Sequence, residues 1–189
     1  MQVHLKHINQ VVMKKYTLIF LLSMCTLLIS NKSFGQTEFK GTRTLYIVRH
    51  AEKDTGSNPA ISLPGKKRAG DLYRTLRKKN IDLIMASQFR RTGMTADSLR
   101  LYNKVDSIQY MADANGDKFY STLQARGGKA KNILVVGHSN TLPSIVRKLG
   151  VSDYTVKELP ETEFDNLFIV KIKKGKATLV QKKFGVPSN

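Results

Sequence analysis

The sequence has only one cysteine, Cys25, so no disulfide can form within the chain. It has no internal repeat, no low-complexity tract and no convincing linker between domains. Without a disulfide, the fold must depend on ordinary packing of an apolar core.

Acidic residues are scarce, because the chain has 14 of them against 32 lysines and arginines, a net charge of +18. Four lysines and no acid lie in the first 35 residues, so residues 36–189 carry 28 basic and 14 acidic residues, a net charge of +14. This balance favours anionic partners. The basic residues are spread along the chain and are not interleaved with aromatic ones, so we expect no nucleic-acid partner. The sequence leaves the oligomeric state open.

The N-terminal region has the pattern of a secretory signal peptide. Residues 13–35 read MKKYTLIFLLSMCTLLISNKSFG, in which two lysines precede a mostly apolar stretch, Tyr16 to Ser30. The small-residue segment Ser33 to Gly35 follows, as expected of a cleavage site. A membrane-spanning helix needs about 20 apolar residues, and this stretch is shorter. We therefore predict cleavage near Gly35.

Residues 1–35 are thus expected to be an N-terminal extension and signal peptide, with Met1 or Met13 as the start. Cleavage would export the mature chain to the periplasm or the extracellular space, without stable membrane association afterwards. The alternative is an uncleaved anchor. Cys25 lies inside the apolar stretch, which does not fit the cysteine of a lipoprotein.

Residues 36–189 suit one domain with a full core. Short apolar runs alternate along them with helical patterns. The sequences LFIVKI and ATLVQKKF flank KKGK and predict a terminal hairpin. We predict strands at Leu45–Val48, Leu83–Ala86, Val105–Tyr110 and Ile133–Val136, and helices at Ser62–Lys79, Arg91–Leu101, Lys118–Arg126 and Leu142–Leu149.

Alternating strands and helices are typical of an α/β fold with helices on both faces of one sheet. We expect a three-layer α/β/α sandwich with a mostly parallel open sheet and a C-terminal hairpin. In such folds the functional site lies beyond the carboxyl ends of the strands, where the strand order switches. The residues directly after each strand are therefore the candidates for the site.

Basic side chains follow three of the predicted strands. Both histidines of residues 36–189 are among them, although a single histidine is more often a hydrogen-bonded structural residue. The side chains are Arg49 and His50 after the first strand, Arg90 and Arg91 after the second, and His138 after the fourth.

Two histidines and two arginines together suit phosphoryl transfer. Guanidinium groups bind phosphate oxygens bidentately and stay charged. A neutral imidazole is a nucleophile near neutral pH, and a second, protonated imidazole can stabilise charge on the transferred oxygens. Because the arginines supply positive charge, this chemistry needs no metal ion and no other cofactor.

The same residues carry a resemblance to a known family. The segments VRHAEK, SLPGKKRAGDL, ASQFRRTGMTA, VVGHSN and DNLFIVKI occur in this order. Together they resemble the histidine phosphatase superfamily, the phosphoglycerate-mutase-like group, over about residues 44–172. The resemblance implies a single histidine phosphatase domain over residues 36–189. The family's Ser-x-x-x-Arg-x-x-x-Thr-Ala segment matches Ser87, Arg91, Thr95 and Ala96.

By position, the resemblance implies that His50 is the phosphorylated nucleophile. Arg49, Arg91 and His138 would form the phosphate pocket. Arg90 is the register alternative to Arg91, although Arg91 fits the motif spacing better.

Three further residues are candidates for substrate contact because they lie beside these positions. They are Glu52, Ser139 and Asn140. For Glu52, as for Lys53, the alternative is an exposed loop. For Ser139 and Asn140 the alternative is capping of the next helix.

The family places a carboxylate between the arginine-bearing helix and the second histidine, to protonate the leaving alcohol. Here the short insert offers Asp113, which follows a predicted strand, and Asp117, which alternatively caps the helix beginning at Lys118. Asp113 is the preferred candidate. A good leaving group, as in a phosphoramidate, depends less on an acid. The short insert is similar to the compact bacterial branch that includes phosphohistidine phosphatases.

The resemblance implies a phosphatase that hydrolyses phosphomonoesters or phosphoramidates through a phosphohistidine on His50. The N-terminal pattern adds that it is exported, and the arginine charges add that it is metal-independent. Its substrate would be a phosphorylated small molecule or a phosphoprotein. A serine hydrolase with Ser139 as nucleophile does not fit, because no histidine follows Ser139. A metal-dependent phosphatase lacks the expected close carboxylate–histidine spacing. A catalytically inactive phosphatase-fold module that binds anionic ligands is the remaining alternative.

Overall fold

The computed structural model describes residues 41–188. The predicted signal peptide, its cleavage site and both candidate start residues lie outside the described residues. In chain order the elements are β1 (Thr42–Arg49), α2 (Leu63–Leu76), β2 (Leu83–Ser87), α3 (Arg90–Tyr102), β3 (Asp106–Tyr110), α4 (Asp117–Arg126), β4 (Asn132–Gly137), α5 (Leu142–Lys148), β5 (Asn166–Lys173) and β6 (Lys176–Lys183). Every predicted strand and helix is present, with ends shifted by at most three residues.

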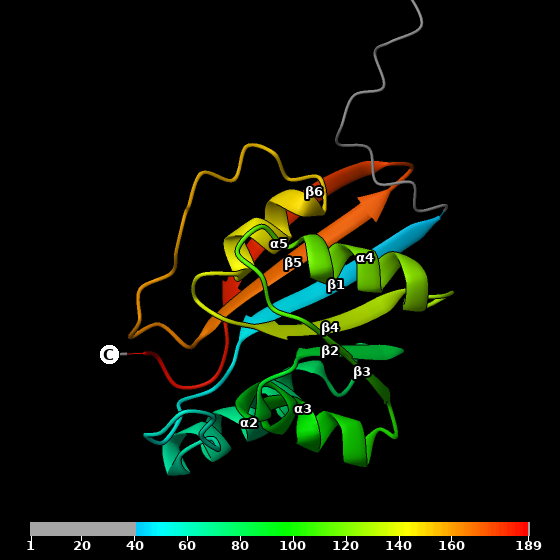
Figure 1. Ribbon diagram of the computed structural model, residues 1–189. Coiled ribbons are helices and arrows are strands. Elements are labelled where there is room, and N and C mark those ends of the chain that lie inside the picture. Colours follow the sequence, from blue (N-terminus) through cyan, green and yellow to red (C-terminus); the bar gives the residue numbers. More distant parts are fainter. Residues whose placement is uncertain (1–40, 189) are drawn as a thin grey trace, which may run out of the picture. The chain divides into compact units, whose positions relative to one another are not determined.

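The strands of residues 41–188 form one open sheet with the order β3-β2-β4-β1-β5-β6 (Figure 1). Within the group β1, β2, β3 and β4, all neighbouring strands pair in parallel. β5 pairs antiparallel with β1 and with β6. The predicted mostly parallel sheet with a C-terminal hairpin is therefore confirmed.

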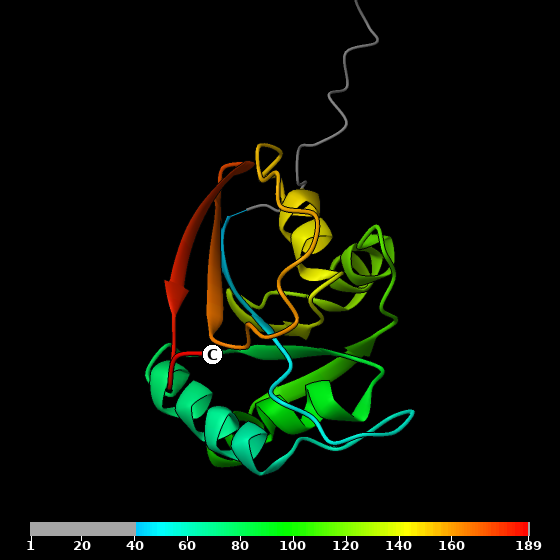
Figure 2. The same cartoon turned by 90° about the vertical axis from the view of Figure 1, so that its left-hand side faces the viewer.

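Side chains of β1 alternate between two apolar clusters. Leu45 and Ile47 pack with residues of α4 and α5, whereas Tyr46 and Val48 pack with residues of α2 and α3. Figures 1 and 2 show these two helix pairs on opposite sides of the sheet. The domain thus has the predicted three layers, and β1 is buried in the middle one.

Local sequence explains the ends of these elements. The Ser62 side chain caps α2 by accepting a hydrogen bond from the Gly65 amide, at 3.3 Å, and Pro64 lies in the first turn. Lys174 and Gly175, with φ of 50° and 75°, form the turn of the hairpin. Two residues with positive φ match the twist of the strands that they join.

The order of the strands creates a crevice at one end of the sheet. β1 and β4 are neighbours, yet β1 leads to α2 on one face and β4 leads to α5 on the other. Connections that leave to opposite faces open a gap beyond the carboxyl ends of the two strands. None of the helices in residues 41–188 is long and apolar enough to cross a bilayer.

The cap of α2 is testable. We expect Ser62→Ala to lower the free energy of unfolding by about 1 kcal/mol, because it removes the acceptor for a helix N-terminal amide. Urea unfolding followed by circular dichroism measures this change. Ser62→Asp keeps an acceptor and is the control. Equal stability of the alanine and aspartate variants would contradict the role of the cap.

Candidate active site

The ends of β1 and β4 bring the two histidines together. Arg49 is paired with Gly137 in the parallel register, and the His50 amide donates to the Gly137 carbonyl at 2.9 Å. The ring centroids of His50 and His138 are 5.2 Å apart. Only 3% of His50 and 6% of His138 is exposed. The structure therefore confirms that the two predicted histidines lie side by side.

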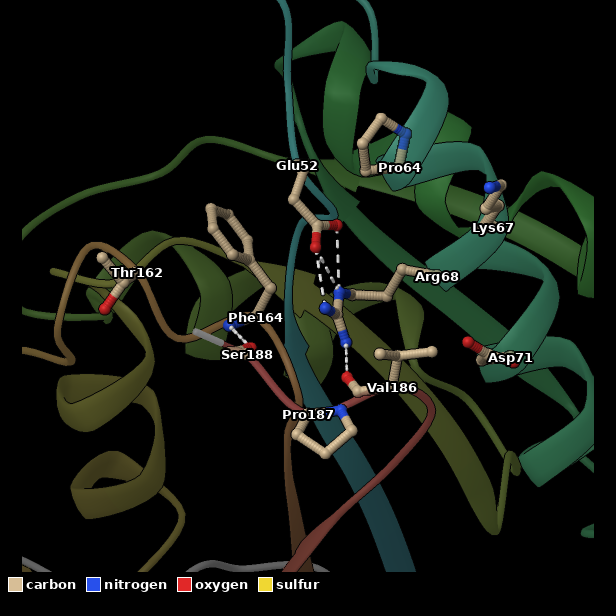
Figure 3. Close-up of a pocket in the computed structure, with 10 residues that line it drawn as sticks. All are labelled: Glu52, Pro64, Lys67, Arg68, Asp71, Thr162, Phe164, Val186, Pro187 and Ser188. Atoms are coloured by element: carbon tan, nitrogen blue, oxygen red, sulfur yellow. Dashed lines mark hydrogen bonds and ion pairs between the residues drawn. The ribbon is translucent and has the colours of Figure 1, made fainter.

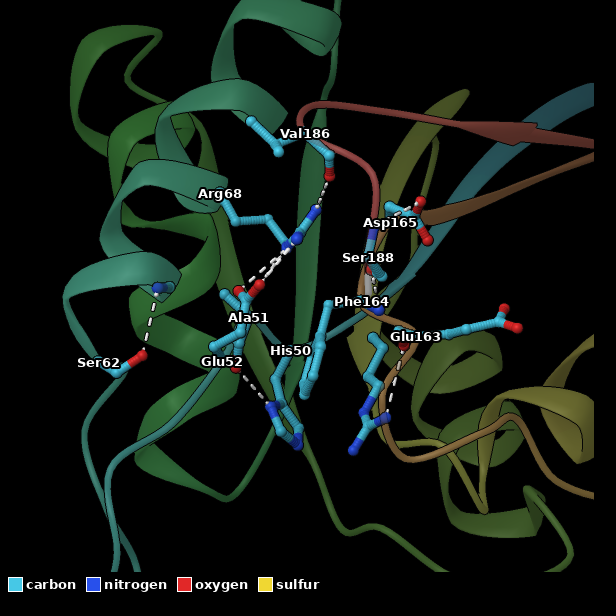
Figure 4. A network of polar contacts seen from close by, with 12 residues as sticks. His50, Ala51, Glu52, Ser62, Arg68, Glu163, Phe164, Asp165, Val186 and Ser188 are labelled. Carbon is cyan, nitrogen blue, oxygen red and sulfur yellow. Dashed lines mark hydrogen bonds and ion pairs between the residues drawn. The ribbon is translucent and has the colours of Figure 1, made fainter.

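The His50 ring is oriented by its own loop (Figure 4). Its Nδ1 lies 2.8 Å from the Ala51 carbonyl oxygen, which can only accept, so Nδ1 carries the proton and Nε2 has the free lone pair. The Ala51 amide donates to Thr95 Oγ1 at 2.9 Å, and that hydroxyl donates to the Arg91 carbonyl at 2.7 Å. The predicted motif residue Thr95 thus fixes the loop that carries His50.

His138 is held from both nitrogens. Arg91 Nη2 lies 3.3 Å from Nδ1, and because a guanidinium can only donate, Nδ1 accepts. The other nitrogen, Nε2, then carries the proton and donates to Ser87 Oγ, 2.8 Å away. The buried Ser87 hydroxyl also lies 3.1 Å from Thr92 Oγ1. Ser87, matched only as a motif position, therefore orients the second imidazole.

Both imidazoles are neutral at pH 7. Burial is the main cause that lowers the pKa of His50 to about 4, with further lowering by the arginine charges. Burial, His50 and the arginines lower the pKa of His138 to about 3. Burial and the neighbouring cations therefore favour the neutral form of His138. A bound phosphate dianion would raise its pKa.

Arg49 is 2% exposed and belongs to a network with the loop before β5. Its Nη1 donates to the carbonyls of Pro160, at 3.0 Å, and Glu161, at 2.8 Å. Its Nη2 pairs with the Glu161 carboxylate, and its Cζ lies 4.2 Å from the centre of the Phe164 ring. Arg49 is therefore held rigidly at the pocket.

Arg91, and not Arg90, points into the site. Arg91 lines the same pocket as the histidines, with its Cζ 4.5 Å from the centre of the Phe89 ring. Arg90 is exposed, and its backbone amide donates to Asn58 Oδ1 at 3.1 Å. The structure thus resolves the register in favour of the arginine that fits the motif spacing.

These side chains line one pocket of about 410 Å³. Of the candidate site residues, all except Glu52, Arg90 and Asp117 line it. The lining residues with ionisable side chains are Arg49, His50, Lys53, Arg91, Asp113, His138, Glu158 and Glu161, and the others include Gln88, Ser139 and Asn140.

Asp113 lines the pocket but also caps a helix. Its two carboxylate oxygens accept from the backbone amides of Asp117, at 3.0 Å, and Lys118, at 3.2 Å, at the start of α4. Asp117 instead pairs with Lys148, 2.5 Å away. The capping role that we considered for Asp117 therefore belongs to Asp113.

Glu52 lies in a different pocket, of about 520 Å³ (Figure 3). Its two oxygens accept from Arg68 Nε at 2.8 and 2.9 Å, and Arg68 also donates to the Val186 carbonyl at 3.0 Å. The structure does not bring Glu52 to the phosphate pocket, because Arg68 of α2 binds it. Glu52 instead joins the loop after His50 to α2 and to the C-terminal segment.

Ser139 and Asn140 line the pocket and do not cap α5. The N-cap residue of α5 is Thr141, which makes no side-chain capping bond to α5. The Thr141 hydroxyl instead accepts from the His138 amide at 3.2 Å. Asn140 is exposed, whereas Ser139 is buried and donates to Glu161 Oε1 at 2.5 Å. The capping alternative is therefore wrong for both residues.

Glu161 is a pocket residue that the sequence did not reveal. Its carboxylate binds Arg49 and Ser139, and the hydrogen bond from Ser139 is the first cause of its lowered pKa. It lies in the acidic segment ELPETEFD, whose composition would have been the only signal. Nothing in the sequence shows that this segment folds back to the ends of β1 and β4.

Within residues 41–188, no group of three or more histidine, cysteine, aspartate or glutamate side chains is arranged to hold a metal ion.

The fold of residues 41–188 is that of the histidine phosphatases, which confirms the predicted fold. No protein-family model matches the sequence, and no curated protein matches it.

Solved structures with this fold include two proteins designated phosphohistidine phosphatase SixA. The one from Nakamurella multipartitia is 17% identical, with a TM-score of 0.60, over 78% of this chain and 98% of its own. The one from Agrobacterium tumefaciens is 19% identical, with a TM-score of 0.57, over 76% and 98%. An alpha-ribazole-5'-P phosphatase from Escherichia coli is 15% identical, with a TM-score of 0.56, over 77% and 97%.

The lowered histidine pKa values predict how stability depends on pH. An unfolded histidine has a pKa of about 6.5, so between about pH 6.5 and 4 the unfolded chain binds more protons than the folded one. The free energy of unfolding should therefore fall as the pH is lowered, by up to about 1.4 kcal/mol per pH unit for each histidine. Urea unfolding between pH 7 and 5 measures the slope.

The double variant His50→Asn/His138→Asn is the control, because it keeps every carboxylate. We expect a much flatter profile for it. If wild type and double variant have the same slope, the two imidazoles are not the source of the pH dependence.

Proposed function

We propose that the protein is a phosphatase that works through a phosphohistidine on His50, and that it hydrolyses phosphomonoesters or phosphoramidates. The observation that carries the proposal is the convergence of His50, Arg49, Arg91 and His138 on one pocket. The phosphatases that share the fold support the reaction class. A phosphorylated small molecule or a phosphoprotein is the proposed substrate, and export of the mature domain stays part of the proposal.

In the first step, Nε2 of His50 attacks phosphorus and the bond to the leaving oxygen or nitrogen breaks. The imidazole is suited to this step because it is neutral and its Nδ1 hydrogen bond to Ala51 fixes the ring. Formation of the P–N bond leaves positive charge on the ring, which the Ala51 carbonyl stabilises from Nδ1. Arg49 and Arg91 bind the equatorial oxygens, where charge gathers.

In the second step, water attacks phosphorus and the P–N bond breaks, which restores neutral His50 and releases phosphate. The arginines supply the positive charge in both steps, so we propose that activity needs no added metal ion. His138 lies 5.2 Å from His50 between ring centroids and takes a proton once a phosphate dianion raises its pKa. It would then donate to a phosphoryl oxygen.

A leaving alcohol also needs a proton, and two pocket carboxylates are candidates. Asp113 lines the pocket from the loop before α4, but both its oxygens already accept helix amides. Glu161 is held ionised, because Ser139 and Arg49 lower its pKa. This arrangement suits a leaving group that is basic enough to take its proton from solvent, such as the nitrogen of a phosphoramidate.

The nucleophile is directly testable. We expect His50→Ala to abolish hydrolysis of a generic aryl phosphate in the presence of a chelator, with a loss of at least about 1,000-fold, because no other described side chain in the pocket offers a free imidazole lone pair. Quenching the wild-type reaction with alkaline denaturant should trap a phosphoenzyme on His50 that is stable in alkali and lost on later exposure to acid.

Arginine variants provide the matched control. Arg91→Gln should weaken hydrolysis strongly, whereas Arg90→Gln, with the same loss of charge outside the pocket, should not. Undiminished turnover by the His50 variant would contradict the proposed mechanism. If the His50 variant binds anionic ligands fully and the wild-type protein shows no turnover, the result would favour an inactive binding module.

Glu161 provides a second test, because its carboxylate competes with phosphate for Arg49. We expect Glu161→Gln to lower KM for an aryl phosphate and the inhibition constant of inorganic phosphate by up to about 5-fold, since an exposed ion pair contributes at most about 1 kcal/mol. We expect kcat to stay within about 2-fold. Steady-state kinetics measure all three constants.

Glu163→Gln is the control, because Glu163 pairs with Lys183 and Asn166 outside the pocket. A large fall in kcat for Glu161→Gln with unchanged KM would instead make Glu161 the proton donor.

A further inference from the structure

The end of the sheet opposite the candidate active site is strongly basic. Five chain segments form it, and we call them the basic pole: residues 41–43, 77–82, 103–106, 126–131 and 173–176. They contain 11 lysines and arginines and 2 acids, whereas the rest of residues 41–188 contains 16 basic and 11 acidic residues. The excess of positive charge is therefore concentrated at this end of the domain.

Hydrogen bonds join these segments to one another. The Asn103 amide side chain donates to the Arg77 carbonyl at 2.9 Å, so the ends of α2 and α3 lie together. Asp82 Oδ2 accepts from the Lys131 amide at 2.8 Å. The segment before β2 is thereby tied to the segment before β4.

The start of β1 continues the same surface. The Thr44 amide donates to the Lys131 carbonyl at 2.7 Å, and Thr42 pairs with Lys173 in the antiparallel register. Figure 1 shows the β5–β6 turn beside the start of β1. The five segments thus form one continuous surface.

This surface keeps its positive charge. The lysines of the basic pole are exposed, and among residues 41–188 none of them takes part in an ion pair. One of the two acids, Asp82, is engaged by the backbone amides of Lys131 and Asn132. Lysines can protect a sheet edge, but most of these lie in helix–strand loops, where there is no edge to protect.

The neighbouring side chains favour a lipid surface as the occupant. Leu101 and Tyr102, at the end of α3, are 60% and 74% exposed and directly precede residues 103–106. An apolar and an amphipathic side chain beside lysines suit the headgroup region of a bilayer.

We infer that the basic pole binds a membrane surface of anionic phospholipids. Clustered lysines near such a surface contribute additively and lose their effect with salt. Because the pole and the phosphate pocket lie at opposite ends of the parallel strands, a protein bound in this way turns its pocket toward the aqueous phase.

Vesicle sedimentation of the full chain tests the inference. The probes are vesicles of phosphatidylcholine with phosphatidylglycerol and vesicles of phosphatidylcholine alone. The readout is the difference in binding between them, so any contribution of the apolar N-terminal stretch that is independent of headgroup charge cancels. We expect strong preference for the anionic vesicles at low salt and its loss at high salt.

Two variants with equal loss of charge locate the surface. Lys79→Gln/Lys129→Gln/Lys173→Gln removes lysines from three segments of the pole and should reduce the preference by about 100-fold. The control Lys66→Gln/Lys118→Gln/Lys157→Gln removes three exposed lysines elsewhere and should reduce it by less than about 5-fold. Both variants should keep wild-type circular dichroism and aryl phosphatase activity, which separates this test from that of the proposed function.

Equal losses in the two variants would overturn the inference, because net charge alone would then explain binding. Equal binding of the wild-type protein to the two kinds of vesicle would also overturn the inference. Binding of a short DNA duplex through the pole, without preference for anionic vesicles, would overturn it in favour of nucleic acid.

Discussion

The hydrogen bond from the His50 amide to the Gly137 carbonyl is the contact on which the site depends. It extends the parallel pairing of β1 and β4 by one step beyond Arg49, so each strand leaves the sheet with a histidine beside the other's. Burial of the two rings then makes both imidazoles neutral. Position and protonation state thus have the same origin in the sheet.

The positions of His50, His138 and Arg91 could be predicted because they depend on strand ends, and strand ends follow from local apolar runs. A parallel sheet brings the carboxyl ends of its strands to one edge, whatever the sequence of the loops. Glu161 and Glu52 could not be placed, because their partners come from other segments. Glu161 reaches Arg49 through a loop without regular structure, and Glu52 is bound by Arg68 of α2. The lowered pKa of His138 could not be predicted either, since burial is a property of the folded chain.

Charge shows the same limit of sequence reasoning. The lysines are spread along the chain, so a basic surface patch cannot be recognised from their spacing in the sequence. The fold gathers the segments around residues 77–82 and 126–131 at one end of the sheet, while the acidic segment before β5 returns to the other end and supplies Glu161. A chain that is basic on average thus becomes a polarised domain with a nearly balanced pocket.

The central place of β1 in the sheet has a consequence for synthesis. A ribosome makes the strand that leads to His50 before the other strands of residues 41–188, yet both its partners, β4 at residues 132–137 and β5 at residues 166–173, emerge much later. Until then β1 is an apolar strand with two open edges, which is prone to wrong pairing. The strand that carries Arg49 and leads to His50 is therefore the one that most needs protection while the chain is incomplete.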